Sequence, residues 1–102
     1  MPADQNGLTF FVGADNSRVF GLIIDNFTGD GIYLGSVTGV VIGSTVRNGD
    51  NEIYKNDGSG VHFVGAANTN NAVINSYIGT NAASAAGLGN RQYGVLLSLI
   101  HI

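Results

Sequence analysis

"NDGSGVHF", residues 56–63, decides the fold, because it joins a polar turn directly to a short apolar strand. Glycine, asparagine and aspartate reach turn conformations that β-branched residues adopt poorly. After the turn, Val61 and Phe63 alternate with His62, which is the period of a strand with one buried face. The stretch therefore predicts a turn followed by a strand, with Val61 and Phe63 inward and His62 outward.

The same pattern occurs at two other places in the chain. Residues 28–34 read "TGDGIYL" and residues 93–97 read "YGVLL", and the glycines that open the three strands are 29 and 34 residues apart. Self-similarity at a spacing of about 20 to 50 residues is typical of repeat architectures. The segment "NAASAAGLG", residues 81–89, is interpreted as a loop inserted between two repeats, which explains the longer second spacing.

Other short apolar runs lie between these strands. They are rich in valine and isoleucine and are bounded by asparagine, glycine and serine, which favours strands; the runs are residues 18–25, 39–43, 51–54 and 71–79. No window shows a sustained helical period, and the sixteen glycines disfavour helices. The sequence therefore predicts an all-β chain wound into coils, in which each strand pairs with its equivalent one coil away, as in a parallel β-solenoid.

Alternation within the strands assigns their side chains to two faces. The inward positions are expected to form stacked apolar columns and are Val19, Ile24, Ile32, Leu34, Ile42, Ile53, Val61, Phe63, Val73, Ile78 and Val95. The outward position in the three glycine-led strands is the third residue. Tyr33, His62 and Leu96 are therefore expected in one exposed column, about one coil apart.

Other repeat architectures conflict with particular residues. Phe27 stands where a leucine-rich repeat requires asparagine or cysteine, and no second copy of that repeat follows. The six-residue apolar period of a left-handed hexapeptide helix is absent. Phe63 lies near the position where a calcium-binding nonapeptide repeat requires aspartate.

Composition excludes several classes of function. Seven acidic and four basic residues give a net charge of −3, so we expect no binding of nucleic acid. The chain has no cysteine, which excludes disulfide bonds and thiolate metal sites, and no run approaches about eighteen consecutive apolar residues, so no membrane span is expected. No spacing typical of a metal site, a cofactor loop or a catalytic triad is present.

The segment from Val40 to Val95 resembles the right-handed parallel β-helix repeats of large secreted bacterial surface proteins. Such arrays contain "IGGT", "NVISGN", "GNYIGTNAAGTAALGN" and "GV", which are similar to residues 42–45, 51–56, 75–90 and 94–95 here. Ser76 departs from the pattern because asparagine is usual at its position. The resemblance implies a right-handed, pectate-lyase-like parallel β-helix of about four coils and a location outside a bacterium or on its surface.

The same helix carries lyases, hydrolases, phage tailspikes and adhesin-like stalks, so the resemblance by itself does not select one function. We expect a structural or surface-exposed module, with glycans as its candidate ligands and no catalytic site of its own. The alternative is a fragment of a polysaccharide lyase or glycoside hydrolase whose catalytic residues lie outside this segment. A phage or cell-surface adhesin segment that binds glycans passively through Tyr33 and His62 is a further alternative. In each case the partners would be a polysaccharide or cell-surface glycan and the neighbouring coils of a longer chain. No cofactor and no metal are expected.

Tyr33 and His62 are the candidate glycan contacts, because an aromatic ring beside an imidazole suits stacking on a sugar ring. The alternative is that both are ordinary exposed strand residues, because Leu96 interrupts their column. Asn26, Asn56 and Asn75 are expected at coil corners, where stacked side chains would form an asparagine ladder. Five acidic residues are expected to form turns or to be solvated, and they are Asp25, Asp30, Asp50, Glu52 and Asp57.

The end of the sequence departs from the repeat. A coil of this kind should turn polar after its strand, whereas "SLIHI", residues 98–102, is mostly apolar. "LSLIHI" is also one reading frame of the transposase mosaic-end sequence used in preparing sequencing libraries. Residues 1–96 are therefore expected to form the coils of a partial domain, and residues 97–102 to be a non-native tail.

Overall fold

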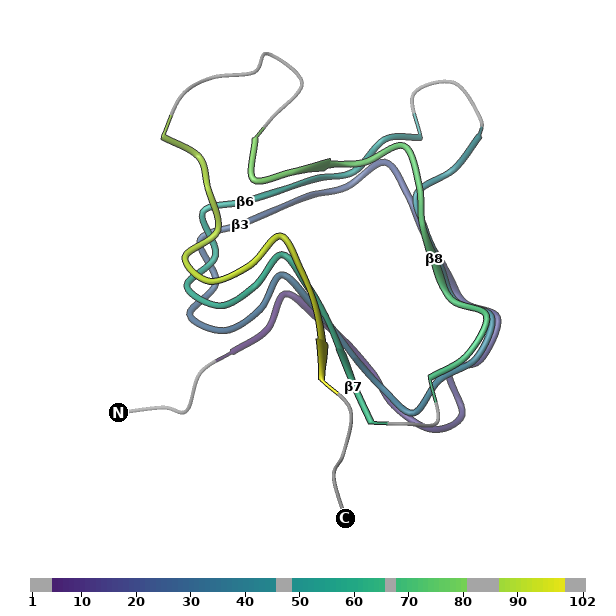
Figure 1. The fold of residues 1–102 in the computed structure, drawn as a ribbon. Helices are drawn as coiled ribbons and strands as arrows, with labels where there is room; N and C mark the ends of the chain where they lie inside the picture. Colours follow the sequence, from purple (N-terminus) through teal and green to yellow (C-terminus); the bar gives the residue numbers. More distant parts are fainter. Residues whose placement is uncertain (1–4, 46–48, 66–67, 81–86, 99–102) are drawn as a thin grey trace.

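The computed structural model describes residues 5–45, 49–65, 68–80 and 87–98, and every regular element in them is a β-strand (Figure 1). The strands are β1 (Leu8–Phe10), β2 (Arg18–Val19), β3 (Ile23–Asp25), β4 (Ile32–Gly35), β5 (Val41–Ile42), β6 (Glu52–Tyr54), β7 (Val61–Val64), β8 (Ala72–Val73), β9 (Tyr77–Ile78) and β10 (Val95–Ser98). This part of the chain has no helix of the length and apolarity that crossing a membrane would need.

The strands form three sheets, and all pairs of neighbouring strands are parallel. The first sheet has the order β1-β4-β7-β10, the second β2-β5-β8 and the third β3-β6-β9. The chain thus visits the sheets in turn and returns to each after three strands, and successive passes overlie one another in Figure 1. We call each set of three strands (β2–β4, β5–β7, β8–β10) a repeat. The prediction of an all-β fold with parallel sheets is confirmed.

The glycines before β4, β7 and β10 align these three strands. Ile32 pairs with Val61, Tyr33 with His62 and Leu34 with Phe63, and β10 continues the same register on the other side of β7. The strand β10 includes Leu97 and Ser98, opposite Phe63 and Val64. Residues 99–102 of the predicted tail and residues 81–86 of the predicted loop lie outside the described residues.

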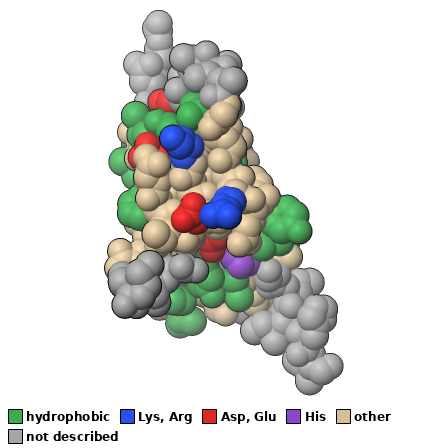
Figure 2. Space-filling model, turned by 90° about the vertical axis from the view of Figure 1, so that its left-hand side faces the viewer, with side chains coloured by type: hydrophobic (Ala, Val, Ile, Leu, Met, Phe, Trp, Pro, Cys, Tyr) green, Lys and Arg blue, Asp and Glu red, His purple; other side chains and the backbone are tan. Residues whose placement is uncertain are grey.

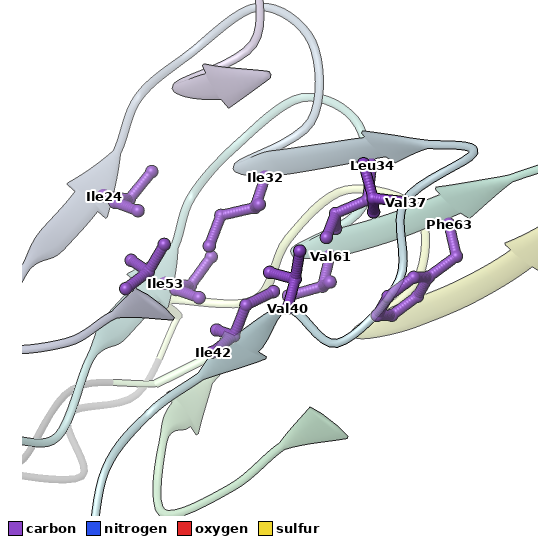
Figure 3. Close-up of a cluster of buried hydrophobic side chains, with 10 residues drawn as sticks. Ile24, Ile32, Leu34, Val37, Val40, Ile42, Ile53, Val61 and Phe63 are labelled. Carbon is purple, nitrogen blue, oxygen red and sulfur yellow. The ribbon is translucent and has the colours of Figure 1, made fainter. Parts of the chain in front are cut away.

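The apolar core lies between the three sheets, where the labelled side chains of Figure 3 point into a shared interior. Most of the predicted inward residues are buried, namely Val19, Ile24, Ile32, Leu34, Ile42, Ile53, Val61 and Phe63. Val73 and Ile78 are partly buried against this core. Val37 and Val40 are also fully buried, although they lie between β4 and β5 and no strand alternation marks them.

Val95 is an exception to the predicted inward column, because 46% of its surface is exposed. It lies on β10, which is paired only with β7 within the described residues. Leu97, in line with Phe63, is 69% exposed for the same reason. The last strand thus presents core-type side chains that, in the inner strands, are covered by a neighbouring strand.

Asparagine side chains join successive repeats at the corners between strands, and two of them, Asn51 and Asn56, are buried. The side-chain oxygen of Asn56 accepts from the backbone N–H of Phe27 (3.1 Å), and its Nδ2 donates to the carbonyl of Ile24 (3.3 Å), both in the preceding repeat. Two other asparagines make the same pair of bonds, Asn51 with Leu22 N and Val19 O, and Asn71 with Val40 N and Val37 O. These amides satisfy backbone groups that the short strands leave unpaired.

Candidate functional site

The outward face of the first sheet carries a row of rings. Tyr33 of β4 and His62 of β7 pack edge to face, with ring centroids 5.6 Å apart and an interplanar angle of 78°. On the other side of Tyr33, the ring of Phe11 packs edge to face at 5.8 Å. Leu96, which pairs with His62, ends the row. Sequence reasoning missed Phe11 because it follows β1 and no strand pattern includes it.

A carboxylate holds the imidazole of His62. Asp30 Oδ2 lies 3.0 Å from His62 Nδ1, and 14% of the Asp30 side chain and 19% of the His62 side chain are exposed. A carboxylate accepts hydrogen bonds, so Nδ1 is the donor in this contact. The sequence indicated only a turn-forming role for Asp30, because the contact joins residues 32 positions apart.

Asp30 is itself positioned by a column of side-chain acceptors that crosses the repeats. Asn6 Oδ1 accepts from the backbone N–H of Asp30 (2.8 Å), and Asp30 Oδ1 accepts from that of Ser59 (2.7 Å). Ser59 Oγ then accepts from the backbone N–H of Tyr93 at 3.4 Å. One carboxylate oxygen therefore belongs to the backbone scaffold while the other orients His62, so the geometry of the pair follows from the stacking of the repeats.

An open hollow of about 680 Å³ lies beside the rings and the carboxylate. Its lining includes the side chains of Asp30, Tyr33, Asp57, His62, Arg91 and Gln92. Figure 2 shows acidic and basic side chains next to each other on this face, close to the histidine. The hollow is lined mainly by polar groups and has aromatic rings at its edge.

Three exposed side chains of this lining have no hydrogen-bond partner among the residues that the structure describes: Asp57, Arg91 and Gln92. Sequence reasoning did not assign Arg91 or Gln92 to the site. The spacing of the repeat could have identified this position. Arg91 lies three residues before the glycine that opens β10, and Thr28 and Asp57 lie at the same distance before the glycines that open β4 and β7. The backbone bonds from Asp57 N to Phe27 O and from Arg91 N to Asn56 O show the corresponding alignment.

The structure does not bring together the three asparagines expected in one ladder. Asn56 is buried and bonds to Asn90 of the next repeat, with its Nδ2 3.0 Å from Asn90 Oδ1. Asn26 and Asn75 are exposed corner residues with positive φ. Asn26 donates to the carboxylate of Asp25, and Asn75 donates to the carbonyl of Ser44.

The other acidic residues lie away from the hollow, except Asp57. Asp25 and Glu52 lie beside Tyr54 on the third sheet, where partial burial is the first cause that raises the pKa of Tyr54 above its usual value of 10.0. The two nearby carboxylates raise this pKa further, because they disfavour the phenolate. Within the described ranges, no group of three or more His, Cys, Asp or Glu side chains is arranged to hold a metal ion.

Comparison with protein-family models, with curated proteins and with solved structures found no match.

Proposed function

We propose that the chain is a segment of a right-handed parallel β-helix that serves as a structural, surface-exposed module of an extracellular or cell-surface bacterial protein. On this proposal it binds glycans at the face that carries Tyr33 and His62, without a catalytic site of its own. The observation that carries glycan binding is the row of rings beside a mainly polar hollow of about 680 Å³.

The return of the chain to each sheet after three strands supports the β-helix. Connections between parallel strands of one sheet are right-handed in about 98% of proteins, which favours a right-handed coil. The exposed Val95 and Leu97 support neighbouring coils of a longer chain as partners, because a further coil would cover them as β10 covers β7.

The face has the two kinds of group that a sugar ring needs. Ring edges and faces of Phe11, Tyr33 and His62 offer apolar contact to the C–H groups of a pyranose. Asp57, Arg91 and Gln92 offer acceptors and donors for its hydroxyl groups. Sites for small polar ligands combine such apolar walls with a few placed polar groups.

Substitution of Tyr33 by alanine is expected to weaken glycan binding by about tenfold, because a ring contact of this kind contributes about 1 kcal/mol or more. A glycan array would identify the ligand, and calorimetry would then compare the variants. Phe20→Ala is the matched control, since Phe20 is an exposed ring that does not line the hollow. Equal affinity of Tyr33→Ala and the original chain, with both folded, would contradict the proposed site.

The second candidate, a fragment of a polysaccharide lyase or glycoside hydrolase, is favoured by one observation. The imidazole of His62 is oriented by Asp30 at the edge of the hollow, which is an arrangement suited to general acid–base catalysis. Incubation with pectins, alginate and related polymers is expected to release no new reducing or unsaturated ends. Turnover that His62→Ala abolishes would establish the enzyme instead.

A further inference from the structure

We propose that the hollow binds uncharged sugar chains more tightly than sugar chains of the same length that carry carboxylates. This inference rests on the proposed glycan-binding function and names the class of glycan. It follows from the charged groups that line the hollow and from their positions on successive repeats.

The fixed charges of the lining are one guanidinium and two carboxylates. Asp30 and Asp57 are acidic and Arg91 is basic, so carboxylates outnumber guanidinium groups in the lining. The whole chain also has a net charge of −3. A polyanionic glycan would therefore approach a surface of its own sign, which lowers both its rate of association and its affinity.

Arg91 is the group that could offset this repulsion, and it has an acidic neighbour. Asp57 and Arg91 occupy equivalent positions on adjacent repeats, as their backbone bonds to Phe27 and Asn56 show. Neighbouring strands of a sheet are about 4.8 Å apart, so the backbones of these two residues lie side by side, and Figure 2 shows an acidic and a basic side chain next to each other on this face. A ligand carboxylate that approached Arg91 would meet the charge of Asp57 at the same place.

Asp30 adds a carboxylate whose position is fixed by hydrogen bonds within the protein. Both of its oxygens accept hydrogen bonds from the protein, one from the backbone of Ser59 and one from His62 Nδ1. Hydroxyl groups, in contrast, can donate to Asp57 and accept from Arg91 or Gln92 without any cost from charge repulsion.

The test compares oligogalacturonides with their methyl esters, and neutral hexose chains with the corresponding uronates, at equal length. Titration calorimetry at low salt is expected to give each uncharged chain an affinity at least about tenfold above that of its acidic counterpart. Added salt is expected to reduce this ratio, because exposed charges are screened. Chitosan oligosaccharides, which are cationic, are titrated in the same way.

Asp57→Asn is expected to shift the ratio toward the acidic chain, by several-fold. Asp50→Asn is the matched control, because Asp50 is exposed and outside the hollow, and it is expected to leave the ratio unchanged. Equal or tighter binding of the acidic chains would overturn the selectivity while leaving glycan binding intact, whereas chitosan is expected to bind at least as tightly as the neutral chains because the protein has a net charge of −3. Binding of none of these chains, nor of any other glycan, would overturn the proposed function itself.

Discussion

Alanine at Gly31 or at Gly60 is expected to lower the free energy of unfolding by about 2–4 kcal/mol, which is a large fraction of the stability of a small domain. Chemical denaturation of each variant, followed by far-ultraviolet circular dichroism, measures the change. The two glycines immediately precede β4 and β7, where the backbone of the next repeat lies against each of them.

The physical reason is the carbonyl of the next repeat. A Cβ atom at Gly31 would lie 2.6 Å from the backbone oxygen of Gly60, and one at Gly60 would lie 2.7 Å from that of Gly94. These oxygens cannot move aside, because Gly60 O accepts from Ile32 N and Gly94 O from Val61 N, both at 2.9 Å. Relief of the clash would therefore break the register between strands.

Two glycines of the same chain provide controls. At Gly94 the nearest atom to an added Cβ is Ile78 Cγ2 at 3.5 Å, and at Gly89 no atom lies within 4 Å. Alanine at either position is expected to be neutral, or slightly stabilising through the lower entropy of the unfolded chain. A loss at Gly94 or Gly89 equal to the loss at Gly31 would show that the effect is a general cost of replacing glycine, and the stacking argument would be wrong.

The second large effect is expected from Asn56→Asp, which keeps the shape of the side chain and removes its donor. Asn56 is 1% exposed, and its Nδ2 donates to the carbonyl of Ile24 and to Asn90 Oδ1. Aspartate would place a carboxylate oxygen against these two acceptors and bury a charge without a counter-ion. We expect a loss of about 3–5 kcal/mol at pH 7.

Asn70→Asp introduces the same charge at an exposed asparagine and isolates the effect of burial. Asn70 has a φ of 55°, a conformation that aspartate also tolerates. Its substitution is expected to change the free energy of unfolding by less than about 0.5 kcal/mol. Thermal denaturation of both variants measures the difference, and losses of equal size would contradict a structural role for the buried amide.

Much of the first sheet could be predicted from the spacing of three glycines. Their alignment gives the pairing of Tyr33 with His62, and the period of two separates the buried Val61 and Phe63 from His62. These are properties of contiguous residues in a strand, so the sequence contains them directly. The two buried valines at 37 and 40 were missed because they lie at a corner, where no fixed period applies.

The asparagines show the limit of the same reasoning. Asn26 and Asn56 both follow a strand of the third sheet, yet Asn56 is buried and Asn26 is exposed. The two corners keep the same alignment, from Asp25 opposite Tyr54 to Ile32 opposite Val61. Asn26 is therefore equivalent to Lys55, and Phe27, which donates to the amide of Asn56, is equivalent to Asn56. A shift of one residue decides whether an amide enters the core or remains in solvent, and composition alone does not reveal it.

By itself, the sequence determined an all-β chain with parallel sheets. It also determined that Tyr33 and His62 share one outward column, because strand alternation and glycine spacing are local properties. Only the tertiary structure decided that Asp30 orients His62 and that Asp57, Arg91 and Gln92 gather around one hollow. These residues come from different repeats, and their distances depend on how the corners stack. The charge of the hollow, and with it the proposed choice of glycan, is therefore a consequence of the stacking of the repeats.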